Sequence, residues 1–218
     1  MNQQPTKMSN KEKNIFIKEL MSRNYKPLDK VLSNTAVGIA GCGGLGSNIA
    51  HMLTRSGIGK LVIADFDTVV TSNLNRQFFF VDDLGRNKVD ALEENLKKIN
   101  PYIQVEKYNT KITSDNLFNI FKNTSIIAEA FDQVSQKTMI LNSFLERKEK
   151  GQFLVLASGM GGIESSNLIK TKKFGNNVYL CGDFSHDFSL GLMAARVNIV
   201  AAHQANTVLR IIAEKFEL

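Results

Sequence analysis

Residues 37–76 read VGIAGCGGLGSNIAHMLTRSGIGKLVIADFDTVVTSNLNR, and this stretch decides the fold. Its first part continues an apolar run, residues 35–40, which predicts a buried strand leading directly into a glycine-rich turn. Residues 47–55 follow with apolar side chains at helical spacing. A helix that starts here favours an anion at its N-terminus, because its first N–H groups and its dipole point there. We therefore expect a phosphate beside Gly41, Gly43, Gly44 and Gly46.

A second apolar run, residues 60–64, predicts another strand, and it ends in Asp65-Phe66-Asp67. Asp65 follows Gly41 by 24 residues, close to the spacing of a carboxylate that binds a ribose hydroxyl. The glycine pattern alone is weak evidence, because tight packing of a strand on a helix also selects glycine. The strand before it, the helix after it and the carboxylate beyond together predict a mononucleotide-binding βαβ unit.

Composition limits the class of protein. The chain has 218 residues, of which 43% are hydrophobic and 22% charged, as expected for one globular domain over residues 10–218 after a disordered polar tail, residues 1–9. No apolar run suits a membrane span or a signal peptide, so we expect a cytoplasmic protein without a membrane partner. Only Cys42 and Cys181 occur, and no Cys-x-x-Cys pair is present to hold zinc. The net charge of +6 is spread along helices, which makes a nucleic-acid partner unlikely.

The rest of the chain continues the alternation of strands and helices. Helices are expected at residues 10–23, 84–99, 115–121 and 134–150, and strands at residues 103–112, 125–130 and 152–158. Residues 167–173 and 177–181 suggest two antiparallel strands, and residues 190–216 a long helix buried between the sheet and a partner subunit. The predicted fold is α/β: a doubly wound, mostly parallel, Rossmann-like sheet with a C-terminal antiparallel extension and a long C-terminal helix.

Polar side chains after the second strand indicate phosphate chemistry. Asn73, Arg76 and Lys88 would bring an amide, a guanidinium and an ammonium towards phosphates, although a lysine in the first turn of a helix is usually solvated. Asp132 ends a later strand at the same crevice. A carboxylate beside phosphates implies Mg²⁺ between them. This set suits attack on the α-phosphate of ATP.

Four motifs resemble the ubiquitin-activating-like adenylyltransferase superfamily in its bacterial ThiF/MoeB form: Gly-x-Gly-Gly-x-Gly, Asp-Phe-Asp-Thr-Val, Ser-Asn-Leu-Asn-Arg-Gln and Gly-Arg-Asn-Lys-Val. The resemblance extends from about residue 33 to the C-terminus. It implies a homodimer that uses Mg²⁺ and ATP to adenylate the C-terminal Gly-Gly carboxylate of a ThiS-like, ubiquitin-fold sulfur carrier. The roles it implies are nucleotide contact for Gly44, Ser72, Asn73 and Gln133, ribose binding for Asp65, phosphate binding for Arg76 and Lys88, and Mg²⁺ ligation for Asp132.

The chain also departs from that family pattern. It lacks the zinc-binding cysteine pairs of longer members, and so resembles the short, zinc-free ThiF-like proteins of thiamine biosynthesis. The chain also lacks the arginine-rich N-terminal motif that, in the family, reaches into the site of the neighbouring subunit. Arg23 is therefore the candidate for that role. Loops 159–162 and 182–189 are expected to form the mobile walls of an acceptor channel. Cys181 is either a sulfur-transfer thiol or a buried small hydrophobe.

Other functions remain open at this point. The acceptor could instead be a molybdopterin-type carrier, a peptide carboxylate or a tRNA-linked carboxylate. The glycine loop and Asp65 alone would also permit an NAD-dependent oxidoreductase. The missing arginine motif permits a binding scaffold without catalytic activity.

Overall fold

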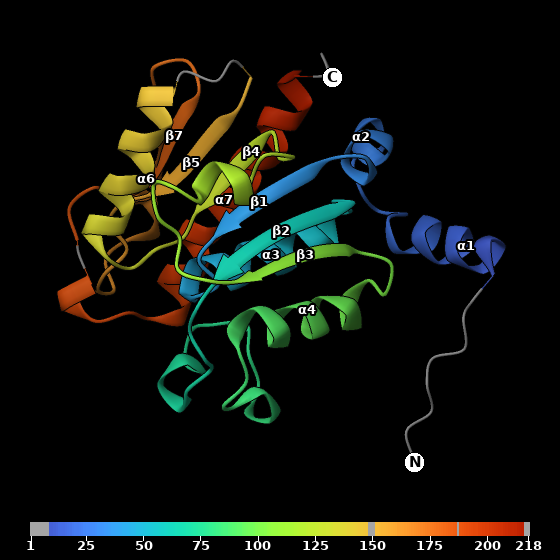
Figure 1. Ribbon diagram of the computed structural model, residues 1–218, viewed down its shortest axis with the longest axis horizontal. Coiled ribbons are helices and arrows are strands. Elements are labelled where there is room, and N and C mark those ends of the chain that lie inside the picture. Colours follow the sequence, from blue (N-terminus) through green and yellow to red (C-terminus); the bar gives the residue numbers. More distant parts are fainter. Residues whose placement is uncertain (1–8, 148–150, 187, 216–218) are drawn as a thin grey trace.

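The computed structural model describes residues 9–147, 151–186 and 188–215, so the predicted disordered tail lies almost wholly outside the described residues. Seven strands form one sheet in the order β3-β2-β1-β4-β5-β7-β6 (Figure 1). All neighbouring pairs are parallel except β6 and β7. The strands are β1 Ala36–Ala40, β2 Lys60–Asp65, β3 Gln104–Asn109, β4 Ile126–Glu129, β5 Phe153–Ala157, β6 Lys170–Phe174 and β7 Val178–Gly182. The predicted doubly wound sheet with an antiparallel extension is confirmed.

Helices cover both faces of the sheet. Helices α3 Gly44–Ser56, α4 Lys88–Ile99 and α7 Ala194–Lys215 pack into one core, and α5 Leu117–Ile120 and α6 Val134–Arg147 pack into the other. The short helices α1 Asn10–Leu20 and α2 Asp29–Ser33 precede β1. The remaining elements are 3₁₀ turns at Lys26–Leu28, Thr71–Asn73, Val81–Asp83, Ser166–Leu168 and Phe188–Leu190. Within the described residues, no helix combines the length and the apolarity that crossing a membrane requires.

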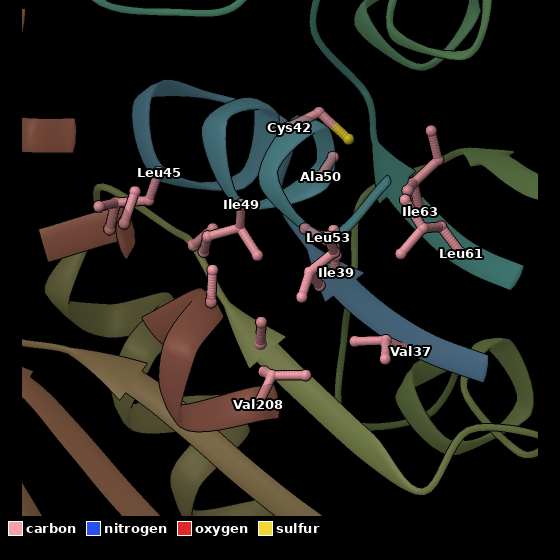
Figure 2. Close-up of a cluster of buried hydrophobic side chains, with 14 of the residues drawn as sticks. Val37, Ile39, Cys42, Leu45, Ile49, Ala50, Leu53, Leu61, Ile63 and Val208 are labelled. Carbon is pink, nitrogen blue, oxygen red and sulfur yellow. The ribbon is translucent and has the colours of Figure 1, made fainter. Parts of the chain in front are cut away.

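The central strands are apolar on both sides because helices cover both sides. Val37 and Ile39 of β1 face Ile49 and Leu53 of α3, and Val208 of α7 closes the same cluster (Figure 2). Strand β1 pairs with β2 on one side and β4 on the other. The chain thus winds outward in both directions from β1 and β4, which places the topological switch point, and the crevice expected there, at their carboxyl ends.

Two glycines fix helix α3 against this sheet. A Cβ atom on Gly46 would lie 1.8 Å from the carbonyl oxygen of Gly41, so only glycine allows the helix to start so close to the turn. At the other end Gly57 terminates the helix in the left-handed conformation, with φ of 97°. The glycine pattern therefore has a packing role as well as an open face towards the crevice.

Helices α4 and α7 each begin four residues later in the structure than the sequence predicted. Helix α4 begins at Lys88 instead of residue 84, because Gly85 has φ of 81° and the backbone of residues 68–69 bonds to residues 85–87. Helix α7 begins at Ala194 instead of residue 190, since Gly191 also has φ of 81°. Both predictions followed apolar spacing through a glycine whose conformation a helix cannot contain.

Helix α7 buries its apolar face within its own chain. Its buried side chains, which include Val197, Val200, Val208 and Ile211, pack on α3 and on the sheet within one chain. The exposed large apolar residues of this region, Leu190 and Met193, precede the helix, and none lies within its described part. The described part of α7 is thus buried within one chain, while burial of residues 190–216 against a partner subunit stays a prediction. Its long run of small residues is explained by close packing on α3.

Candidate nucleotide-binding site

A cavity of about 190 Å³ opens at the carboxyl ends of β1, β2 and β4, where the topology places the crevice. The lining residues come from the glycine turn, the segment after β2, the start of α4, the loops after β3 and β4, and the region before α7. They include Gly41, Gly43, Gly44, Asp65, Asp67, Arg76, Gln77, Lys88, Thr110, Ile112, Asp132, Gln133, Met160, Leu192 and Val197.

The glycine turn is held open towards this cavity. Gly41 has φ of 96°, and its N–H donates to the carbonyl oxygen of Ala64 at 2.9 Å. A Cβ atom on Gly43 would meet only the Gln77 amide nitrogen within 4 Å, at 3.8 Å, so the backbone there borders open space. A ligand can therefore approach the start of α3 closely. Gly46, by contrast, does not line the cavity and packs against Gly41.

Asp65 links the glycine turn to the end of β2. Its carboxylate accepts the N–H of Cys42 at 2.6 Å and the N–H of Asp67 at 2.8 Å. Burial raises the pKa of Asp65, opposed by the positive charge of Lys88 and by these two N–H donors. The carboxylate lines the cavity with further lone pairs available, which is compatible with the predicted ribose contact.

Lys88 is the first residue of α4, and its side chain is only 7% exposed. Its ammonium lies 2.7 Å from a carboxylate oxygen of Asp67, and its backbone N–H donates to the Asp67 carbonyl oxygen at 2.9 Å. Lys88 is therefore a buried, ion-paired side chain and not a solvated surface lysine. Asp67 is not among the site residues expected from the sequence, although its position in Asp-Phe-Asp was the available signal.

Arg76 lines the cavity beside the glycine turn. Its guanidinium donates to the carbonyl oxygen of Ser72 at 3.0 Å and to the side-chain oxygen of Asn75 at 2.8 Å. Ser72 and Asn73 do not line the cavity, and the Asn73 side-chain oxygen instead accepts the N–H of Val70 at 3.1 Å. Their predicted nucleotide contacts stay predictions, and in this structure they support the segment that carries Arg76.

Asp132 and Gln133 lie in the loop after β4, exposed at the cavity. Within the described residues, the Asp132 carboxylate has no hydrogen-bond or ion-pair partner, and no three acidic, histidine or cysteine side chains gather as a metal cluster. One free carboxylate fits Mg²⁺, which binds through one or two carboxylates, phosphate oxygens and water. Asp132 would hold the ion next to the phosphates and the ion would neutralise their charge.

A buried ion pair that the sequence analysis missed supports this loop. Glu129, fully buried at the end of β4, accepts the N–H of Phe131 at 2.6 Å and the ammonium of Lys137 at 2.8 Å. The Glu129 carbonyl oxygen accepts the side-chain amide of Gln204 at 2.8 Å. Helices α6 and α7 thus both fix the point at which the Asp132 loop leaves the sheet. An apolar strand that ends in a glutamate was the only sequence signal.

Both cysteines are buried, and burial raises the pKa of each thiol. Cys181 contacts the hydroxyls of Thr171 at 3.5 Å and Thr207 at 3.7 Å. A buried thiol with a raised pKa carries little thiolate and is a poor nucleophile. This environment favours the interpretation of Cys181 as a small core residue.

Arg23 lies at the opposite end of α3 from the glycine turn. Its neighbour Asn24 donates to the carbonyl oxygen of Ser56, the last residue of α3, at 2.9 Å. The 13 residues of that helix span about 20 Å. Within one subunit, Arg23 is therefore remote from the cavity, and a role in catalysis would require a neighbouring subunit.

An open α/β sheet with a glycine turn, a buried carboxylate and cationic side chains at its switch point defines a Rossmann-like fold, the class in which ligands bind at this crevice. More specifically, the chain belongs to the ThiF family, whose model matches residues 17–217.

Known proteins similar to this chain include curated sequences and solved structures. The ubiquitin-like modifier-activating enzyme 5 of Dictyostelium discoideum is 47% identical over 91 residues, covering 42% of this chain and 24% of that protein. The Drosophila virilis enzyme of the same name is 41% identical over 118 residues, covering 54% and 29%. The chain therefore matches only about a quarter of the length of these relatives.

Among solved structures, the Escherichia coli tRNA N6-threonylcarbamoyladenosine dehydratase TcdA in complex with ATP superimposes with a TM-score of 0.82. It is 20% identical, and the match covers 97% of this chain and 99% of that one. Escherichia coli MccB has a TM-score of 0.66 at 25% identity, covering 86% and 58%. TcdA thus shares the fold over essentially its whole length.

Proposed function

We propose that this chain catalyses the ATP-dependent adenylation of the C-terminal carboxylate of a ThiS-like, ubiquitin-fold sulfur carrier in thiamine biosynthesis. The observation that carries the proposal is the meeting of Arg76, Lys88 and Asp132 around the open glycine turn in one cavity. Two cations and one free carboxylate suit Mg·ATP. An NAD-dependent oxidoreductase would need neither a second cationic side chain nor the Asp132 carboxylate at this position.

In the proposed reaction, a carboxylate oxygen of the acceptor forms a bond to the α-phosphorus of ATP. The bond from that phosphorus to the oxygen bridging to the β-phosphate breaks, and pyrophosphate leaves with the electron pair. Arg76 and Lys88 would neutralise the negative charge that grows on the phosphate oxygens, in a site already arranged for it. Asp65 would orient the ribose.

The choice of a protein acceptor is supported by the curated relatives, which are named as activating enzymes for a ubiquitin-like modifier. A second acceptor class is supported by the full-length fold match to a tRNA-modifying dehydratase. Molybdopterin-type carriers and peptide carboxylates are further acceptors to test. A catalytically silent scaffold would bind nucleotide without turnover.

We also propose a homodimer located in the cytoplasm, where Mg·ATP is abundant. Exposed apolar side chains follow β2 and offer a surface for association: Val70, Phe80, Val81 and Leu84. A twofold dimer could bring Arg23 of one subunit towards the site of the other. Light scattering at low micromolar concentration tests this, and a monomer there would contradict it.

The direct test of function is pyrophosphate–ATP exchange with purified protein, Mg²⁺ and a Gly-Gly-ended ThiS-like carrier. We expect exchange that depends on the carrier, and parallel reactions with a MoaD-like carrier and with tRNA identify the acceptor class. Exchange with none of them would overturn adenylation. Thermal-shift measurements distinguish the adenylyltransferase from an NAD-dependent oxidoreductase. For the adenylyltransferase, Mg·ATP should raise the melting temperature and NAD should not.

A further inference from the structure

Arg196 occupies an unfavourable place for a cation. It is the third residue of α7, where the positive end of the helix dipole opposes its charge, and its side chain is only 4% exposed. A guanidinium persists in such a place only if buried acceptors compensate it.

The compensating acceptors come from two separate loops. In the loop after β5, the Arg196 guanidinium donates to the carbonyl oxygens of Gly161, at 2.9 Å, and Glu164. From the loop after β7, it pairs with the carboxylate of Asp183, whose side chain is 2% exposed. Arg196 therefore connects both loops to the start of α7.

Asp183 and His186 complete the connection. The Asp183 carboxylate accepts the N–H groups of Ser185 and His186, each at 2.9 Å, and contacts the His186 ring nitrogen Nδ1 at 2.9 Å. The His186 carbonyl oxygen then accepts the N–H groups of Met160, at 2.9 Å, and Gly161, at 3.0 Å. The two loops are thus hydrogen-bonded to each other as well as to Arg196, which their glycine content did not predict.

These loops form one wall of the nucleotide cavity. Met160, Leu192 and Val197 line it, and the N–H of Gly162 bonds to the carbonyl oxygen of Gly191 at 3.0 Å, next to Leu192. The lining side chains of this wall are apolar and give a phosphate no charge to bind. The cationic side chains that line the cavity, Arg76, Lys88 and Lys111, come from other segments.

We propose that Arg196 and Asp183 are positioning residues for the acceptor: they fix the Met160–Leu192 wall along which the carboxylate-bearing chain reaches the α-phosphate. This inference rests on the proposed adenylation. Arg196 touches neither the nucleotide nor the reacting atoms in this arrangement. Its loss should change acceptor use and leave nucleotide binding intact.

The test compares Arg196→Met with Arg210→Met, a matched change on the same helix at a side chain that is 70% exposed. Calorimetry measures the affinity for Mg·ATP, hydrogen exchange measures protection of residues 159–165, and pyrophosphate exchange measures KM for the ThiS-like carrier. We expect unchanged ATP affinity, faster hydrogen exchange in that loop and a KM raised about tenfold or more for Arg196→Met. Arg210→Met should match the wild type in all three.

Because Arg196→Met leaves Asp183 buried without its cation, the double variant Arg196→Met/Asp183→Asn provides a version with no unpaired charge. It should fold and still show the loosened loop. Unchanged loop protection, or ATP affinity that falls in parallel with acceptor use, would overturn the inference. If the wild type shows no pyrophosphate exchange with the carrier, the proposed adenylation is wrong. In that case the hydrogen exchange of residues 159–165 and the affinity for Mg·ATP still decide whether Arg196 fixes this wall.

Discussion

The ammonium of Lys88 lies 2.7 Å from the carboxylate of Asp67, at the point where β2 has ended and α4 begins. Asp67 also accepts the Lys88 backbone N–H and donates its own N–H to Asp65. The cation proposed to bind phosphate and the carboxylate proposed to bind ribose are therefore both held by Asp67. This relation connects the two halves of the proposed site.

Lys88→Met should weaken Mg·ATP binding by about tenfold to a hundredfold, as expected for losing a hydrogen bond to a charged group worth about 1.5–3 kcal/mol. The fold should survive, since the Asp67 side chain left behind is 49% exposed. Calorimetry checks this against Lys98→Met, an exposed lysine on the same helix. Equal affinities in the two variants would remove Lys88 from the site.

Arg76→Ala should lower the rate of adenylation by about 100-fold to 1000-fold with an unchanged melting curve, because its guanidinium serves charge that develops in the transition state. Among the described residues, the Arg76 guanidinium bonds only to the backbone carbonyl of Ser72 and to the exposed side chain of Asn75, so the substitution removes little packing. Single-turnover kinetics measures the effect. Arg55→Ala, on the exposed side of α3, is the control, and a variant at Arg76 that keeps wild-type rates would refute the assignment.

Asp132→Asn should shift the Mg²⁺ titration of activity to higher concentration, because an amide is a weaker ligand for a hard cation than a carboxylate. ATP binding in the absence of Mg²⁺ should stay the same or improve, as one negative charge near the phosphates is gone. Asp82→Asn, on an exposed turn, serves as control. An unmoved titration would mean that the ion is held by other groups.

Two glycine substitutions separate packing from ligand space. Gly46→Ala should destabilise the fold by about 2 kcal/mol or more, since its Cβ would lie 1.8 Å from the Gly41 carbonyl oxygen. Gly43→Ala should keep the melting temperature, because its Cβ meets nothing closer than 3.8 Å, and should weaken ATP binding by filling ligand space. Denaturation and calorimetry on both variants measure the contrast. The reverse pattern would show that the nucleotide does not approach Gly43.

Stability in acid should report on Asp183. Burial alone would raise the pKa of Asp183, but hydrogen bonds from His186 and Ser185 and the Arg196 guanidinium outweigh it and lower the pKa from 3.8 to about 2. A depressed carboxyl pKa stabilises the folded state above the unfolded pKa, by about 2 kcal/mol here, and this is lost as the pH falls from about 4 to 2.

Asp183→Asn should therefore be less stable than the wild type at pH 7, and the difference should shrink across that window. Urea denaturation at pH values from 2 to about 7 measures the gap. Asp115→Asn, at an exposed side chain, provides the comparison. A gap that stays constant with pH would show that the Asp183 charge contributes no stability.

The sequence by itself determined the βαβ half of this protein that carries the proposed nucleotide site. The apolar runs before Gly41 and before Asp65, and the helical spacing between them, act over a few neighbouring residues, so the order of strand, turn, helix and strand is fixed locally. The same local signals predicted the alternation that builds the parallel sheet and the position of Asp132 at its carboxyl edge. Family motifs added Arg76 and Lys88 as candidates.

Tertiary structure decided what the side chains contact. The pairing of Lys88 with Asp67, of Glu129 with Lys137 and of Arg196 with Asp183 joins segments that the chain brings together only after packing. The same holds for α7, whose apolar run is buried on α3 of its own subunit. Periodicity reports which face of an element is apolar, but it does not identify the neighbour, because burial depends on the position of every other element.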